Sequence, residues 1–408
     1  MFIMKEKNIN VEKEKCMDEE RCNIVLAGLI YDQNLGDQVI YKCCRNMIEK
    51  TLINTNYELR NIDLYGRVRM NNNSLTDLTY KVISKIKRKL KNQKNVEEEI
   101  LENVNKSCKV NIDRKTKALI FVGGGLIKFN HQFLAKSIEK IVEYANLHDI
   151  PVMFSAVGVE GYDENSQECL SLKEKINLPC VKMITTRDDI LLLREKWIIH
   201  NRIESGLVGD PACVISNYFK IEKINTGRKR IGLGVSRGNL FEDYGGLLNE
   251  DKLIQLWIGV YKKLENNGFD CYIFTNGLDA DQNFAIKLIK ILGKKYESKL
   301  LHKPNTIEEL CTNIANFDGM IVTRLHASII GYSYNIPFVS LVWNNKQTMF
   351  GKVIEKSEWF IKEDKMTVEN IYEKFLNVYG SKNNFINKKS FSISTYTYLN
   401  KFIHDYVM

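Results

Sequence analysis

The chain has 408 residues, of which 44% are hydrophobic and 27% are charged, and its formal net charge is +9. This composition is ordinary for a soluble globular protein, and the length exceeds what one hydrophobic core usually serves, so two domains are expected. No apolar run approaches the roughly 20 residues that cross a bilayer, and the charged N-terminus lacks the apolar core of a secretory signal. We therefore expect a cytoplasmic protein.

Ten cysteines are scattered along the chain, and none forms a CxxC pair. Neither zinc spacing nor a disulfide framework is visible, so the cysteines are expected to be small apolar core residues. We expect no DxD or HExxH metal motif, and the phosphate-binding loop GxxxxGK[ST] and a true GxGxxG are absent as well. The sequence therefore does not support a metal centre, nor ATP or NAD as a cofactor.

Buried strands alternate with helices from the beginning of the chain. We expect a disordered or loosely attached lead-in at residues 1–21, followed by a strand at 23–29 and a loop that carries Gly36 and Asp37 before a helix from Gln38. Further strands are expected at 57–64, 118–122, 151–157, 181–185 and 207–211. Repeated strand–loop–helix units predict a doubly wound parallel sheet in an N-terminal domain at 22–216.

Two of the strand ends carry distinctive residues. Gly123, Gly124 and Gly125 follow one strand, and either tight strand–helix packing or a ligand that contacts bare peptide groups explains three glycines there. Arg187 and Asp188 follow another strand. We interpret this pair as mainly structural, with Asp188 as a helix N-cap.

A charged excursion at 66–116 interrupts this domain and contains the basic segment 81–94, which has seven cations and no acid. Its apolar residues recur at helical spacing, which predicts a basic amphipathic helix. A solvated surface helix is one interpretation, and docking on an anionic membrane surface that holds a lipid-linked substrate is the other. Nucleic acid is disfavoured because no aromatic residues interleave with the cations.

A polar linker at 217–229 precedes a second series of strands and helices at 230–350, which predicts another Rossmann-like domain. Strands are expected at 230–235, 270–274, 300–302, 320–322 and 338–342, and helices at 249–266, 281–292 and 327–334. The final segment, 351–408, has helical patches, and the sequence leaves open whether it crosses back to the first domain. The expected fold is thus α/β, with two Rossmann-like domains and a central cleft.

Basic and titratable side chains gather at strand ends of the second domain. Arg324 and His326 lie between the strand 320–322 and the next helix, while Arg237 and Lys346 follow other strands. Ligands of open α/β sheets bind at the carboxyl ends of strands, and two guanidinium groups suit a ligand with two anionic groups. With a histidine to move a proton, the residues favour a transferase or lyase acting on a small phosphorylated acid. A purely structural His326 is the alternative, and His302 is a second candidate.

Several short motifs together resemble the polysaccharide pyruvyl transferase family. They are Asn34-Leu35-Gly36-Asp37-Gln38, Gly123-Gly124-Gly125, Val157-Gly158, Thr186-Arg187-Asp188, Gly209-Asp210-Pro211 and Arg324-Leu325-His326. The resemblance implies a fold like that of the GT-B glycosyltransferases, with phosphoenolpyruvate as donor and a pair of sugar hydroxyls as acceptor. The product is then a pyruvate ketal on a cell-surface polysaccharide or its lipid-linked precursor, formed in the cytoplasm or at the inner face of the membrane.

The same resemblance assigns roles to the candidate residues. Arg324 and Arg237 hold the phosphate and carboxylate of the donor, Leu325 lines the pocket, and His326, in its protonated form, is the general acid/base. The donor site also takes in Lys346 and Asn276, and the acceptor side takes in Gly36, Asp37, Gly124 and Gly125. Two other functions stay open: a nucleotide-sugar glycosyltransferase of the same architecture, and a non-catalytic partner in glycan assembly.

Overall fold

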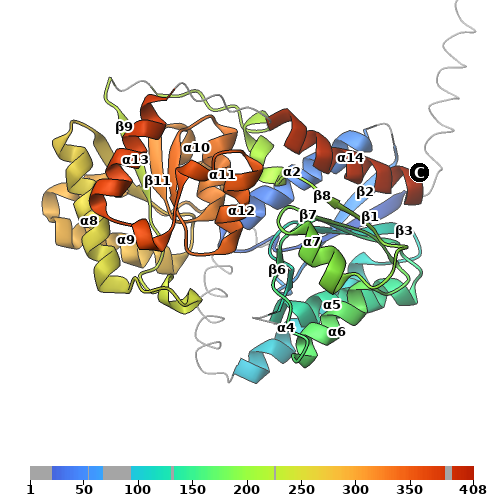
Figure 1. Cartoon of the computed structure of the whole chain (residues 1–408). Helices are drawn as coiled ribbons and strands as arrows, with labels where there is room; N and C mark the ends of the chain where they lie inside the picture. The colour runs from blue at the N-terminus through green and yellow to red at the C-terminus, as the bar shows by residue number, and fades with distance from the viewer. Residues whose placement is uncertain (1–20, 54, 68–92, 130–132, 225–226, 382–387) are drawn as a thin grey trace, which may run out of the picture.

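The computed structural model describes residues 21–53, 55–67, 93–129, 133–224, 227–381 and 388–408. These residues form two α/β lobes that lie side by side, each built on a parallel sheet (Figure 1). The predicted fold class, two Rossmann-like α/β domains, is confirmed. The basic segment predicted at 81–94 lies outside the described residues, except for Gln93 and Lys94 at the beginning of a helix.

The first domain contains a six-stranded sheet in the order β2-β1-β3-β5-β7-β8, and each neighbouring pair runs parallel. Its strands are β1 (Cys22–Gly28), β2 (Tyr57–Asp63), β3 (Thr116–Val122), β5 (Val152–Val157), β7 (Val181–Thr186) and β8 (Glu204–Leu207). The central strands are continuous apolar runs because helices cover both of their faces. A separate pair, β4 (Ile127–Lys128) and β6 (Val159–Glu160), joins two loops at the carboxyl edge of this sheet.

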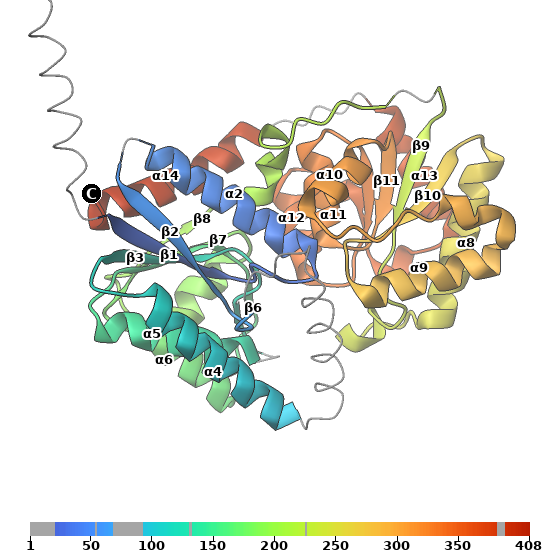
Figure 2. The ribbon, with the colours of Figure 1, turned by 180° about the vertical axis from the view of Figure 1, so that it is seen from behind.

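Helices α4 (Gln93–Asn111), α5 (Phe133–Leu147) and α6 (Gln167–Ile176) cover one face of the first sheet, and α2 (Leu35–Thr51) covers the other (Figures 1 and 2). Helix α4 belongs to the excursion at 66–116, and its Val104 and Cys108 are buried in the core of the domain. Helix α2 begins at Leu35, three residues earlier than predicted. Gly36 and Asp37 therefore belong to its first turn rather than to a loop.

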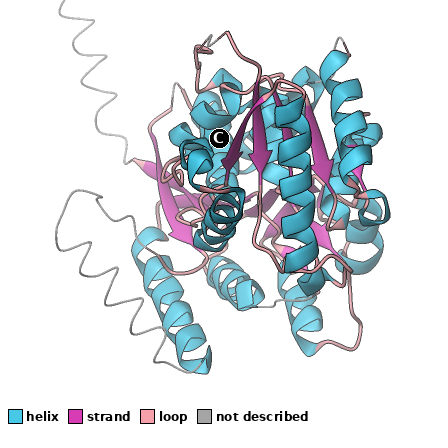
Figure 3. Cartoon of the chain, turned by 90° about the vertical axis from the view of Figure 1, so that its left-hand side faces the viewer, coloured by secondary structure: helices cyan, strands magenta, loops and turns pink. Residues whose placement is uncertain are grey.

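The second domain contains a five-stranded parallel sheet in the order β10-β9-β11-β12-β13, with helices on both faces (Figure 3). Its strands are β9 (Arg230–Gly234), β10 (Asp270–Phe274), β11 (Gly319–Val322), β12 (Phe338–Leu341) and β13 (Phe360–Ile361). Its helices are α8 (Glu250–Asn266), α9 (Asp279–Leu292), α10 (Ile307–Ala315), α11 (Leu325–Ser333), α12 (Asn345–Val353) and α13 (Val368–Gly380). The prediction of a strand at 300–302 is wrong, because this segment forms only an isolated β-bridge, between Leu300 and Ile273.

The last helix, α14 (Lys388–Tyr406), lies on the first domain, on the same side of the sheet as α2 (Figure 1). The Thr395 hydroxyl donates a hydrogen bond to the Gly209 carbonyl at 2.7 Å, and the chain end reaches Tyr57, whose hydroxyl donates to the Val407 carbonyl at 2.7 Å. The chain thus returns to its first domain after completing the second.

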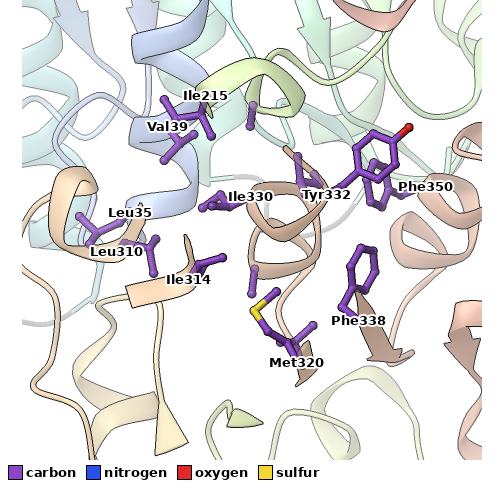
Figure 4. Close-up of a cluster of buried hydrophobic side chains, with 14 of the residues drawn as sticks. Leu35, Val39, Ile215, Leu310, Ile314, Met320, Ile330, Tyr332, Phe338 and Phe350 are labelled. Atoms are coloured by element: carbon purple, nitrogen blue, oxygen red, sulfur yellow. The ribbon is translucent and has the colours of Figure 1, made fainter. Parts of the chain in front are cut away.

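An apolar core joins the two domains (Figure 4). Leu35 and Val39 of α2 belong to the same buried cluster as Leu310 and Ile314 of α10 and Ile330 of α11. Each fully buried side chain of this kind contributes about 1.5–3 kcal/mol. These contacts hold the N-terminal end of α2 against the second domain, where its first turn meets the candidate site.

Candidate active site

The carboxyl end of β11 is rigidly held. The Thr323 carbonyl accepts hydrogen bonds from the Trp343 indole nitrogen at 2.7 Å and from Gln347 Nε2 at 3.0 Å. Arg324 follows as the N-cap residue of α11, in an extended conformation and without a side-chain capping bond. This geometry fixes the backbone that carries Arg324, which pairs within the second domain, and His326, which reaches α2 of the first domain.

His326 is buried at the junction of the two domains and contacts Gly36 of α2. A Cβ added to Gly36 would overlap the imidazole, so glycine is what allows the ring to lie against this helix. The imidazole Nε2 is buried and has no hydrogen-bond partner among the described residues. The structure therefore places a buried histidine nitrogen without a described hydrogen-bond partner between the domains.

Burial lowers the pKa of His326 to about 3, and the positive charges of Arg187, Lys346 and Arg324 act in the same direction. The ring is therefore neutral near pH 7. We expected the protonated form of His326 to be the catalytic one, and that expectation needs correction. The imidazole would become charged near pH 7 only if additional negative charge lay beside it. A neutral imidazole is suited to accept a proton.

Arg187, interpreted from the sequence as structural, is the charge with the largest influence on His326. Its guanidinium forms a buried ion pair with Asp210, and its Nε is buried without a hydrogen-bond partner. The predicted N-cap is also displaced by one residue, since Asp189, not Asp188, accepts the hydrogen bond from the Leu192 backbone N–H at 2.9 Å. Arg187 is thus a site residue that sequence reasoning missed, because the approach of β7 to α11 has no local signal.

The glycine loop after β3 faces the same junction. Gly125 lies against the Lys346 ammonium, which would be 2.7 Å from an added Cβ, whereas a Cβ on Gly123 would overlap Ile40 of α2. Gly124 lies close to Asp37, whose Oδ1 would be 3.8 Å from an added Cβ. Helix packing therefore accounts for Gly123, the close approach of the Lys346 ammonium accounts for Gly125, and the positive backbone φ of 75° accounts for Gly124.

Lys346, at the beginning of α12, crosses from the second domain to the first. Its ammonium forms an ion pair with Glu160 at 3.0 Å, and both side chains are largely buried. Lys128 lies nearby on β4, and its pKa is lowered by burial and by the charge of Lys346. The structure thus brings Gly36, Asp37, Gly124, Gly125, His326 and Lys346 together at one junction.

The two arginines predicted to grip the donor already have carboxylate partners. Asp281, fully buried in the first turn of α9, accepts hydrogen bonds from Arg324 Nε at 2.9 Å and Nη2 at 2.6 Å. It also accepts one from the Arg237 backbone N–H at 2.9 Å. The Arg237 guanidinium instead pairs with Asp243 and Asn239. The expectation of two uncommitted guanidinium groups therefore needs correction, because Asp281 and Asp243 compensate their charges.

Asp281 was missed because its position in a helical first turn suggests nothing more than a favourable helix dipole. Together with Asp279 it forms a DxD pattern, which can hold a divalent cation through two carboxylates. Here the two carboxylates pair with Arg324 and Lys303 instead. In the described part of the chain, no group of three or more histidine, cysteine, aspartate or glutamate residues could hold a metal ion.

Asn276, Leu325 and His302 have different surroundings. The buried Asn276 accepts a hydrogen bond from the Leu35 backbone N–H at 3.2 Å through its carbonyl, and its side-chain Nδ2 has no hydrogen-bond partner among the described residues. Leu325 packs against the apolar core beside the site. His302 is exposed, at the surface of the second domain. Asn276 and Leu325 thus lie by the junction, and His302 does not join it.

The comparisons with known proteins identify the family and the fold. The sequence profile of the polysaccharide pyruvyl transferases matches residues 34–345, from the N-cap of α2 to the beginning of α12. The chain belongs to the polysaccharide pyruvyl transferase family. Membership of this family means that the protein is a transferase of polysaccharide biosynthesis. No curated protein matches the sequence.

Solved structures with a similar fold include several UDP-GlcNAc 2-epimerases. The enzyme from Methanocaldococcus jannaschii, in complex with UDP-GlcNAc and UDP, has a TM-score of 0.58 and 13% identity, with 94% of this chain and 99% of that chain covered. The enzyme from Neisseria meningitidis bound to UDP-GlcNAc has a TM-score of 0.56 and 10% identity, with the same coverage. At these identities the likeness defines the fold, which is GT-B-like.

The structure also bears on membrane association. No helix in the described ranges combines the length and apolar character needed to cross a bilayer. Contact with a membrane surface through the segment 81–94 stays a prediction.

Proposed function

We propose that the protein transfers pyruvate from phosphoenolpyruvate to a pair of hydroxyl groups on a sugar, forming a ketal on a cell-surface polysaccharide or its lipid-linked precursor. The observation that carries the proposal is the neutral His326, with a free Nε2, among Arg187, Arg324 and Lys346. Such a site combines a proton acceptor with cations that attract a phosphorylated acid. The family to which the chain belongs supports the pyruvyl group as the one transferred.

The donor is expected on the second-domain side of the junction. Lys346 offers an ammonium group, and Arg324 has an Nη1 that no described hydrogen bond uses. From the first domain, Arg187 adds an Nε without a described hydrogen-bond partner. Each is fixed by a carboxylate, so the donor meets oriented N–H groups rather than flexible charges. Well-placed donors of this kind stabilise charge that develops on a leaving phosphate by roughly 3 kcal/mol each.

The acceptor is expected on the opposite side, where Gly36 contacts the imidazole and the glycine loop lies near Asp37 and Lys346. His326 then accepts the proton of the sugar hydroxyl as its oxygen adds to C2 of the donor. A bound phosphate raises the pKa of His326 from its low starting value and makes the imidazole a better base. A lipid-linked acceptor would fit enzyme action at the inner face of a membrane.

Alanine substitution at His326 tests the role of the imidazole. We expect His326→Ala to abolish turnover and to leave the affinity for phosphoenolpyruvate within a few-fold of the wild type, because the phosphate contacts remain. His302→Ala is the matched control, since this exposed histidine lies outside the junction, and its turnover should be unchanged. Near-normal turnover by His326→Ala would show that the assignment of His326 is wrong.

Calorimetric titration separates this function from the alternatives. The wild-type protein should bind phosphoenolpyruvate and not UDP-sugars. Binding of a UDP-sugar alone would favour a nucleotide-sugar glycosyltransferase, and binding of neither would favour a non-catalytic partner in glycan assembly.

A further inference from the structure

Ketal formation requires two proton transfers that one neutral imidazole cannot perform together. C3 of the enolpyruvyl group must gain a proton while the attacking sugar hydroxyl loses one. Near pH 7 His326 is neutral, so it can accept a proton but is too weak an acid to protonate C3. A separate proton donor is therefore needed close to the imidazole.

Asp37 is a carboxyl group in the first turn of α2, the turn that the imidazole contacts through Gly36. It follows Gly36, which lies directly against the His326 ring, and both belong to the first turn of α2. Its Oδ2 accepts a hydrogen bond from Asn34 Nδ2 at 2.8 Å. No hydrogen bond among the described residues ends on its Oδ1, which lies near Gly124 on the side of the glycine loop.

The surroundings of Asp37 contain both signs of charge. Asp32 is its negative neighbour and is held by an ion pair with Arg67 at 3.0 Å. Arg187 at the end of β7 and Lys346 of α12 are its positive neighbours. Farther groups that interact with Asp37 are Lys128 on β4 and Tyr65 after β2.

The net effect of these surroundings is that the Asp37 carboxyl keeps its proton to a higher pH than an ordinary aspartate does. Burial raises the pKa of Asp37 to about 6, with Asp32 acting in the same direction and Arg187, Lys346 and Asn34 acting against them. A phosphorylated donor adds negative charge to the junction and raises this pKa further. Two neighbouring titratable groups with pKa values displaced in opposite directions are the usual arrangement of an acid and a base.

We propose that Asp37 is the general acid that protonates C3 of phosphoenolpyruvate, while His326 is the base for the attacking hydroxyl. The inference rests on the proposed function. In the first step the Asp37 proton bonds to C3, the C2–C3 double bond becomes single, and the sugar oxygen bonds to C2 as its proton moves to His326. In the second step the bond between C2 and the phosphate oxygen breaks, and the leaving phosphate takes the proton from His326. The second hydroxyl bonds to C2 and returns a proton to Asp37, so both residues regain their starting forms.

The test is the pH dependence of kcat for wild-type enzyme and two isosteric variants. In the wild type, kcat should fall at high pH as Asp37 loses its proton. Asp37→Asn should lower kcat by at least about 100-fold, the usual contribution of a general acid, and should remove this alkaline limb while leaving the affinity for phosphoenolpyruvate within about threefold. Asp32→Asn should keep the limb and move it to lower pH, because it removes the like charge nearest to Asp37.

The outcomes distinguish this inference from the function on which it rests. Failure of the wild-type protein to bind phosphoenolpyruvate would overturn the proposed function and the role of Asp37 with it. An Asp37→Asn enzyme with wild-type kcat and an unchanged alkaline limb would overturn the role of Asp37 alone. Thermal unfolding at pH 8 checks that the variant is folded: its midpoint should equal or exceed that of the wild type, since the amide removes a partly buried charge.

Discussion

Substitution of Gly36 by alanine tests the contact that positions His326. An added Cβ would lie closer than 3.0 Å to the imidazole, a separation that real Cβ atoms essentially never show. Overpacking of this kind typically costs about 1–3 kcal/mol, whereas alanine in a helix gains roughly 1 kcal/mol over glycine. We therefore expect Gly36→Ala to lower the free energy of unfolding by about 1 kcal/mol and to displace the imidazole.

The assays are urea unfolding and turnover with phosphoenolpyruvate. The loss of turnover should exceed what the small change in stability explains, because a displacement on the order of 1 Å at the reacting centre can cost about 100-fold in rate. Gly380→Ala in α13 is the matched control, since nothing lies within 4 Å of its added Cβ. It should keep full turnover and unfold no more easily than the wild type. If Gly36→Ala behaves like Gly380→Ala in both assays, then the His326 imidazole does not lie directly against Gly36 of α2.

Three further predictions follow from the ionic contacts of the site. Asp281→Ala should lower the free energy of unfolding by about 3 kcal/mol in urea, because it leaves the Arg324 guanidinium without its buried partner; a loss below about 1 kcal/mol would contradict this. Between pH 6.5 and 3 the unfolded chain binds a proton at His326 that the folded protein does not, so acid should destabilise the wild type relative to His326→Gln by up to about 1.4 kcal/mol per pH unit; parallel stability curves would refute the buried neutral state. Lys346→Met should weaken phosphoenolpyruvate binding about tenfold in calorimetry, as expected for a lost charge-assisted contact, while Glu160→Gln should not; equal effects would mean that Lys346 is structural.

The sequence was sufficient to predict the strand and helix that meet at the candidate site. A short buried strand followed by a turn and an apolar helical segment predicts β11 and α11. Arg324 and His326 lie where these two elements meet. Parallel sheets have their ligand-binding side chains at this edge, so the position follows from the pattern alone. That Gly124 and Asp37 face the site from the first domain was implied by the family resemblance instead.

The pairing of charges could not be read from the sequence. Arg324 pairs with Asp281, which is 43 residues away in the sequence, and Arg187 pairs with Asp210, which is 23 residues away. Both contacts depend on how the helices pack on the sheets. Local patterns indicated no role for Asp281 beyond the beginning of a predicted helix, and Arg187 was interpreted as structural. The protonation state of His326 was missed for the same reason, since it depends on burial between two domains.

Ketal formation by the wild-type protein is the most direct test of the proposed function. The protein is incubated with phosphoenolpyruvate and candidate free or lipid-linked sugars, and released phosphate is measured together with the mass of the sugar. We predict one phosphate per modified sugar and a mass gain of one pyruvate less one water. Absence of both products across acceptors, or phosphate release without any gain in sugar mass, would contradict it.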